Sequence, residues 1–241
     1  MPADKKPIPS VWARPRKEPQ QPALSRELIV AEAIKLLDAD GIEALSMRKL
    51  GTKMGAAATS LYRHVANKDE LIELVVDEVY GELRVTAADD PADWRQALAA
   101  TARDLRDLAL SHPWVSAVLG QVGLSYLGPN MLRVSGAMLA TLVEAGFPAD
   151  EADPAMSTVF SYVIGMTVSE TAYLSMIARS GQTEQEWAEQ LWPAAEQAVK
   201  GHPQLVADYA AKQGVDPVQA RQEAFDYGLD RVLDGLATRI P

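Results

Sequence analysis

The stretch Leu45–Lys68, LSMRKLGTKMGAAATSLYRHVANK, decides the fold of the N-terminal part of this 241-residue chain. Ser46 is a good N-cap for a helix over 47–54, and Gly55 can take the left-handed conformation that ends such a helix. Three alanines then lead into a second short helix over 58–64. Two short helices joined by a tight turn are typical of a helix-turn-helix, whose second helix enters the major groove of DNA.

The second of these helices presents small residues first and long polar side chains last. Hydroxyls near its N-terminal end can reach base edges. A phenol and an imidazole can each donate to phosphate oxygens, while an arginine can contact a phosphate or pair with guanine. Alone, a Tyr-x-His pair more often lies on an ordinary surface or in a core, so the surrounding motif carries the interpretation. The candidate DNA contacts in this stretch are Ser46, Ala57, Thr59, Ser60, Tyr62, Arg63, His64 and Lys68.

The distribution of charge separates this segment from the rest of the chain. The formal net charge is −10, which for the whole molecule argues against contact with phosphates. Residues 1–68, however, hold 12 Lys and Arg against 7 Asp and Glu, whereas residues 69–241 hold 11 against 26. A basic head on an acidic body favours nucleic-acid binding by the head, although a merely solvated basic surface would give the same count.

Residues 1–24 are expected to form a flexible, basic, proline-rich arm. Six prolines exclude a regular helix there. Arg14 and Arg16 are candidate DNA contacts, because arginines on such arms can enter a narrow minor groove. A disordered tail without a role is the competing interpretation. Trp12 favours a function, since tryptophan is unusual in a purely solvating tail.

The remainder of the chain predicts helices throughout, so the expected fold is all-α. Residues 25–70 should form a three-helix DNA-binding domain, and residues 71–241 a larger helical domain for ligand binding and dimerisation. Cap signals and apolar periodicity predict helices near 26–40, 68–83, 91–110, 113–122 and 130–145. Asp153-Pro154 should open a very apolar helix, Thr183 one helix in an otherwise irregular segment 180–216, and Asp216-Pro217 the last helix.

Several classes of protein find no support in the sequence. With no cysteine and only three histidines, a thiolate metal site is impossible and a catalytic metal is poorly supplied, so we expect neither metal nor cofactor. No nucleophile elbow, phosphate-binding loop or dinucleotide fingerprint is present, so we expect no enzymatic activity. The N-terminus lacks an apolar leader, and no apolar run is long enough for a spanning helix. A soluble, cytoplasmic protein without a membrane partner is the expectation.

The quoted stretch, continued by the DEL that follows it, strongly resembles the N-terminal domain of the TetR family of bacterial transcriptional repressors. The match covers about 25–85, and weaker similarity over 112–170 resembles the C-terminal domain of the tetracycline-repressor type. The resemblance implies a homodimer joined by a four-helix bundle, a double-stranded operator, and a cavity for a small-molecule effector. It places DNA contacts on Arg48 and Lys68, and on the polar residues of the second short helix.

Two features of the tetracycline repressor do not carry over. A base-reading glutamine falls on Ala58 and the following proline on Thr59, so the operator sequence cannot be transferred. A magnesium-binding histidine falls on Leu119, a drug-anchoring asparagine near Thr101 and a phenylalanine on Leu105. Recognition of tetracycline with magnesium is therefore not expected.

The body contains methionines and aromatic residues that could line an effector cavity. Such a set is more often ordinary core, although adaptable side chains suit apolar pockets. Glu170 and Thr167 are the best polar candidates, and a solvent-facing helix surface is the alternative for them. The candidate effector contacts are Leu105, Trp114, Leu119, Met138, Phe160, Ile164, Thr167, Glu170 and Tyr173.

The expected function is therefore a ligand-responsive repressor that a small, largely apolar molecule releases from a palindromic operator. The alternative is a small-molecule binding or carrier protein in which the DNA-binding motif is vestigial.

Overall fold

The computed structural model describes residues 24–85, 90–122 and 128–240 of the chain. These residues contain eleven α-helices and two short 3-10 helices, and no strand occurs among them. The expected all-α class is confirmed. None of the helices in these three ranges is both long and apolar enough to cross a membrane.

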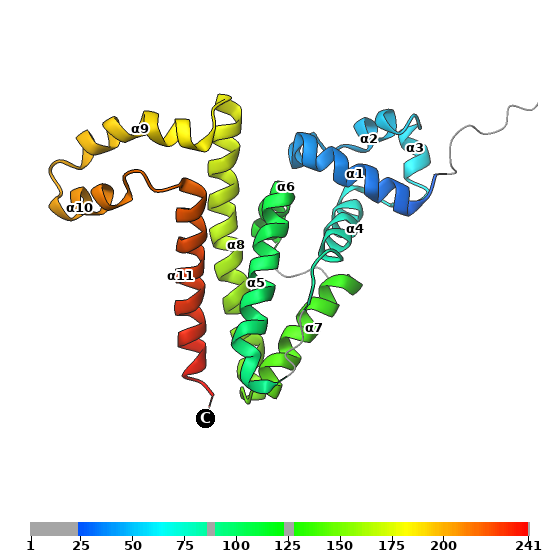
Figure 1. The fold of residues 1–241 in the computed structure, drawn as a ribbon. Coiled ribbons are helices and arrows are strands. Elements are labelled where there is room, and N and C mark those ends of the chain that lie inside the picture. The colour runs from blue at the N-terminus through cyan, green and yellow to red at the C-terminus, as the bar shows by residue number, and fades with distance from the viewer. Residues whose placement is uncertain (1–23, 86–89, 123–127, 241) are drawn as a thin grey trace, which may run out of the picture.

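The head consists of α1 (Arg26–Asp40), η2 (Ile42–Ala44), α2 (Met47–Lys53) and α3 (Ala58–Leu61). It sits at one end of the molecule, with α3 at its outer edge (Figure 1). Ser25 caps α1 by accepting from the Leu28 amide, as its sequence predicts. Leu61 and Val65 are 0% and 1% exposed. They hold the stretch Leu45–Lys68, called the reading segment below, against α1, because burial of such side chains is the main force available to so short a helix.

The helix α4 (Lys68–Tyr80) leaves the head and enters the body (Figure 1). Asn67 caps it, accepting from the Glu70 amide at 2.8 Å. The Glu70 carboxylate reaches back to the Ala66 amide at 2.6 Å, so this capping box closes one residue earlier than the usual form. Leu71 and Val75 are fully buried, which fixes α4 between the two parts of the molecule.

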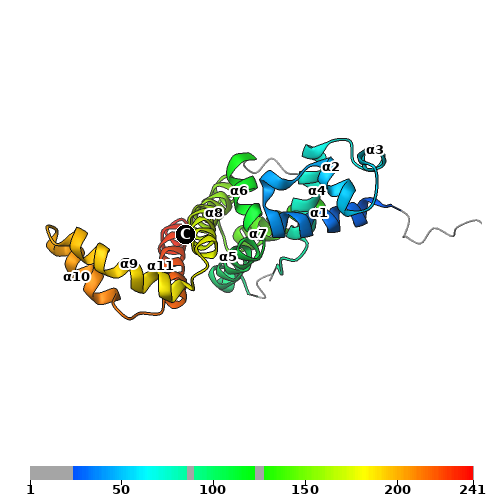
Figure 2. The same cartoon turned by 90° about the horizontal axis from the view of Figure 1, so that it is seen from above.

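The body is built around α8 (Ala149–Ser180), which packs against α5 (Trp94–Ser111), α6 (Pro113–Val122), α7 (Pro129–Glu144) and α11 (Pro217–Ala237). The 3-10 turn η3 (Pro91–Asp93) leads into α5. Helices α5, α8 and α11 run side by side, and α7 lies obliquely between them and α4 (Figures 1 and 2).

Two expectations about this region are wrong. The apolar helix does not open at Asp153-Pro154; α8 begins at Ala149 and continues through Pro154. Proline is tolerated because it removes only one backbone bond near the start of the helix, and its ring lies on the exposed face. The segment 180–216 is not irregular either. It forms an antiparallel pair, α9 (Glu184–Val199) and α10 (Pro203–Lys212), which projects away from the body (Figures 1 and 2).

The start of α9 follows its sequence signal, whereas α10 was not predicted. Thr183 and Glu186 form the predicted reciprocal capping box. His202 precedes α10 without a side-chain capping bond, and α10 buries no residue. Pro203 at its first position is a helix-start signal that the sequence interpretation missed.

Candidate DNA-binding surface and buried ion-pair cluster

The turn between α2 and α3 has the tight geometry that its glycines predict. Ser46 caps α2 by accepting from the Lys49 amide at 3.2 Å. Gly55 has a φ of 65°, the left-handed conformation that glycine adopts without steric penalty. A Cβ atom on Gly51 would lie 2.8 Å from the Ala56 carbonyl oxygen. Backbone therefore passes directly over Gly51, and α2 and α3 can approach closely only because this residue has no side chain.

The helix α3 ends at Leu61, earlier than the predicted His64. Beyond Leu61 the amides of Arg63 and His64 bond to carbonyls three residues back, at 3.4 and 2.9 Å. The chain tightens here because it must turn to reach Asn67, which starts α4. Tyr62, Arg63 and His64 thus lie on the turn after α3 and not on a two-turn helix.

The candidate DNA contacts in the described residues lie close together in the chain fold, on or beside α2 and α3. Tyr62 is 50% exposed, and His64 is half-buried. All of these candidates are exposed or partly exposed, namely Ser46, Arg48, Ala57, Thr59, Ser60, Tyr62, Arg63, His64 and Lys68. The arm residues Arg14 and Arg16 lie outside the described residues.

The basic residues of the reading segment fall into two groups. Lys49 pairs with Asp40 at 2.9 Å, and Lys53 with Glu32 at 3.5 Å. The other three cations of the reading segment are Arg48, Arg63 and Lys68. None of them forms an ion pair within the described residues. These three can therefore meet phosphates without first giving up a carboxylate partner within that part of the chain.

The head contacts the body at α6 as well as through α4. Trp114 donates from Nε1 to Asp38 on α1 at 2.7 Å, and His112 Nδ1 lies 2.7 Å from the same carboxylate oxygen. Trp114 is buried in this junction, so it joins the two parts. If Trp114 contacts an effector, it does so at the junction between the head and the body.

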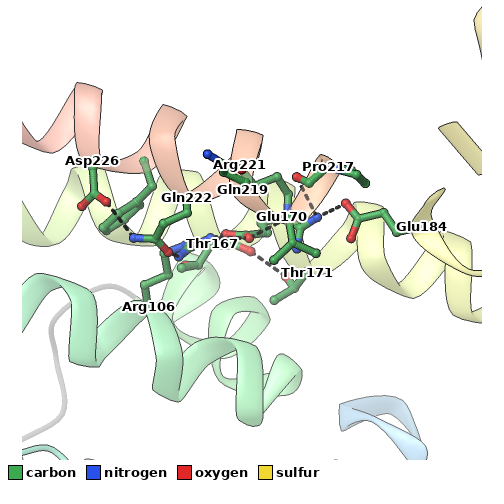
Figure 3. Close-up of polar contacts among 12 residues, drawn as sticks. Arg106, Thr167, Glu170, Thr171, Glu184, Pro217, Gln219, Arg221, Gln222 and Asp226 are labelled. Atoms are coloured by element: carbon green, nitrogen blue, oxygen red, sulfur yellow. Dashed lines mark hydrogen bonds and ion pairs between the residues drawn. The ribbon is translucent and has the colours of Figure 1, made fainter. Parts of the chain in front are cut away.

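The body contains a buried cluster of ion pairs that connects four helices (Figure 3). Arg106 on α5 donates from Nε and Nη2 to the two carboxylate oxygens of Glu170 on α8, at 2.8 and 2.6 Å. Arg221 on α11 donates to Glu170 at 2.9 Å and also pairs with Glu184 at the start of α9. Arg106 reaches Gln222 on α11 as well.

Burial and charge act in opposite directions on Glu170. Desolvation would raise the pKa of this carboxyl, but the hydrogen bonds from Arg106 and Arg221 outweigh it and hold the pKa below its ordinary value. The side chains of Arg106 and Glu170 are 5% and 7% exposed. The solvent-facing alternative for Glu170 is therefore wrong, and Glu170 is ionised and paired in the interior at neutral pH.

Two of the nine candidate effector contacts line a shared hollow. Glu170 and Tyr173 border an open hollow of about 360 Å³ between α8, α9 and α11, and Met166, Pro217 and Ala224 add apolar surface to its lining. The other candidates are distributed through the core. Leu105, Trp114, Leu119, Met138, Phe160 and Thr167 are buried, and Ile164 is partly buried.

The sequence interpretation did not single out Arg106, Asp38 or Asp77, although each makes a polar contact between distant parts of the chain. Asp77, for example, accepts from the Asn130 and Met131 amides at 2.9 and 3.0 Å. An isolated charge on the apolar face of a helix would have been the only available hint. Among the described residues, no group of three or more acidic and histidine side chains is placed to hold a metal.

The chain matches two family models of known proteins. Residues 29–75 match the tetR family of bacterial regulatory proteins, and residues 87–240 match the tetracyclin repressor-like C-terminal domain. The first match spans the head and most of α4, and the second covers the body from just before η3 to the end of α11.

Individual relatives agree with these matches. An HTH-type transcriptional regulator of Saccharopolyspora erythraea is 35% identical over 232 residues, covering 95% of this chain and 91% of the relative. The crystal structure of the TetR family protein ActR of Streptomyces coelicolor in complex with actinorhodin has a TM-score of 0.72 at 27% identity, covering 89% of this chain and 97% of ActR. BioQ, solved with its double-stranded DNA operator, has a TM-score of 0.57 at 32% identity, covering 66% of this chain and 93% of BioQ.

Since a single family accounts for the head, the connecting helix and the whole body, the chain belongs to the tetR family of bacterial regulatory proteins.

Proposed function

We propose that this chain is a ligand-responsive transcriptional repressor, which binds an operator as a homodimer and leaves it when a small, largely apolar molecule binds the body. The observation that carries the proposal is the reading segment. It combines Arg48, Arg63 and Lys68, none of them in an ion pair of the described chain, with the exposed ring of Tyr62. Such cations on a helix-turn-helix, attached to an acidic body, favour contact with DNA phosphates.

The surface of α8 supports the dimer. Its outer face is uncharged over more than four turns and holds Ser161, Gly165, Val168, Ala172 and Met176, all exposed. Val168 and Met176 are each 40% exposed. Apolar and small residues on such a face favour close packing against another helix, and two-fold symmetry would bring α8 of one protomer against its partner. One pair of heads would then face two half-sites of a palindromic operator.

The interior of the body supports an apolar effector with a few polar groups. The hydroxyls of Tyr80 on α4 and Ser116 on α6 are buried, and neither has a hydrogen-bond partner within the described residues. A buried hydroxyl without a partner destabilises a protein by about 1–3 kcal/mol, so a ligand that bonds to one gains affinity there. Both helices also contact the head, α4 through α1 and α6 through α1 and η2. We propose that the effector contacts the nine candidate residues named from the sequence.

Release from DNA then follows from unequal binding. An effector that binds one conformer of the body more tightly than another shifts the population toward it. If the favoured conformer moves α4, the two heads no longer match the spacing of the half-sites, and affinity for the operator falls.

Footprinting of the protein on the region upstream of its own gene tests the proposal. We expect a protected segment with two-fold symmetry at low salt. Absence of any specific protection under those conditions would contradict a repressor acting on that region.

A reporter in cells separates a regulator from a carrier protein with a vestigial motif. We expect Tyr62→Ala with His64→Ala to raise expression from the protected promoter. Tyr209→Ala, which removes a tyrosine on α10 far from the head, is the control and should leave expression unchanged. Unaltered expression in the double variant would favour the carrier.

A further inference from the structure

The helices α4 and α7 hold each other by their ends. Asp77, near the C-terminal end of α4, accepts from the backbone amides of Asn130 and Met131 in the first turn of α7, at 2.9 and 3.0 Å. Its second oxygen accepts from the Asn130 side chain at 3.2 Å. A carboxylate in this position satisfies amides that have no partner inside the helix, and it faces the positive end of the α7 dipole.

The opposite contact comes from α7. Arg133 donates from Nη2 to the Tyr80 and Leu83 carbonyl oxygens, both at 3.3 Å. These carbonyls lie at and just beyond the C-terminal end of α4, where a cation is favoured. The Tyr80 carbonyl also accepts from the Leu83 amide at 3.2 Å, so Arg133 adds a second donor there. Each helix therefore caps the other, with an acid from α4 and a base from α7.

The fit around Asp77 leaves little freedom. A Cβ atom placed on Gly128, which precedes α7, would lie 2.1 Å from the Asp77 carboxylate oxygen. Only glycine allows the start of α7 to come this close. The register between the two helices is thus fixed by contact and not only by apolar packing.

We propose that Asp77 and Arg133 are positioning residues, which set the place of the DNA-binding head relative to the body and pass movements of α7 to it. Two observations support this. The last turn of α4 is held by α7, while its first residue, Lys68, is the last residue of the reading segment. Movement at the C-terminal end of a rigid helix must appear at its N-terminal end. The consequence for operator affinity rests on the proposed function, whereas the consequence for head position does not.

Spin labels measure the head position without DNA. The chain has no cysteine, so Glu43→Cys in the head and Gln96→Cys on α5 give two unique labelling sites, both exposed. Labelled protein is diluted with excess unlabelled protein, so that the two labels of one protomer dominate the pulsed-EPR signal. We expect a single narrow distance distribution for the parent, and a broadened or displaced one for Asp77→Ala.

A matched control separates positioning from loss of stability. Asp216 accepts from the Val218 and Gln219 amides at 2.8 and 3.0 Å, the same kind of cap, but at the start of α11. Asp216→Ala should lower the melting temperature comparably and leave the distance distribution unchanged. Arg133→Gln removes the cation that α7 contributes to the contact. Because the Arg133 side chain is largely exposed, this variant should fold and allow the distance measurement even if Asp77→Ala does not fold.

Operator binding is the second measurement. We expect Asp77→Ala and Arg133→Gln each to weaken binding about fivefold, a typical size for coupling between sites, and Asp216→Ala to have no effect. An unchanged distance distribution in both variants, or the same broadening in Asp216→Ala, would overturn the inference. If the parent fails to bind the footprinted region, the proposed function is wrong, and the distance measurement still decides whether Asp77 and Arg133 position the head.

Discussion

Replacing Glu170 by glutamine tests how far the buried cluster stabilises the body. The substitution keeps the shape of the side chain but removes a charge that three hydrogen bonds from Arg106 and Arg221 satisfy, at 2.8, 2.6 and 2.9 Å. Arg106 is then left as an uncompensated cation with a 5% exposed side chain. Breaking a buried pair in this way destabilises proteins by about 3–5 kcal/mol. For a body of this size, that corresponds to a fall in melting temperature of roughly 10 °C.

Thermal and urea unfolding of three variants give the measurement. Glu151→Gln is the matched control, because Glu151 also pairs with an arginine through both oxygens, but on the surface. Its effect should be much smaller, since solvent screens exposed pairs. Arg106→Met combined with Glu170→Leu removes both buried charges and should be more stable than Glu170→Gln. Equal effects of Glu170→Gln and Glu151→Gln would refute the idea that burial makes the cluster important.

The same residue gives the stability a defined pH dependence. The pKa of Glu170 in the folded protein lies below the ordinary value of 4.5. Its contribution is therefore present in full above that value and is lost as the pH falls toward the folded pKa. Glu170→Gln should accordingly lose less stability than the parent between pH 5 and pH 3. A parallel decline of the two proteins would contradict the depressed pKa.

Three further predictions concern the other proposed contacts. Deleting residues 1–22 should weaken operator binding and reduce its dependence on salt, and unchanged affinity at moderate salt would show the arm to be dispensable. Val168→Glu should shift the protein toward monomers in analytical ultracentrifugation, whereas Val206→Glu, at the same 40% exposure on α10, should not. Asp38→Asn removes the charge that Trp114 and His112 contact, so hydrogen exchange in α1 should accelerate. Protection of α1 equal to that of the parent would contradict a role for this junction.

The starts of helices were predictable because their signals are local. Ser25, Ser46, Asn67 and Thr183 each accept from the amide of the third residue of their own helix, and a short window of sequence contains both partners. The left-handed glycine at position 55 is equally local. The helix-turn-helix could therefore be placed, and the all-α class with it.

The ends of helices and the polar contacts of the interior were harder, because distant residues determine them. Pro154 reads as a helix start, yet burial of Ala152 against the core carries α8 through it. Arg106 and Glu170 are 64 positions apart, and Asp77 and Asn130 are 53 apart. No local pattern connects such pairs, so they appear only once helix packing brings them together.

The most direct measurement of the central claim is a fluorescence anisotropy titration of the protein against two duplexes of equal length. One duplex carries the footprinted upstream segment, and the other carries the same bases in scrambled order. We expect tighter binding of the first by a factor of at least about 10³, as specific binding requires. We also expect Tyr62→Ala with His64→Ala to weaken binding to the first duplex, because both side chains are proposed phosphate contacts. Equal affinity of the parent for both duplexes, or unchanged affinity in the double variant, would contradict DNA recognition by the Leu45–Lys68 segment.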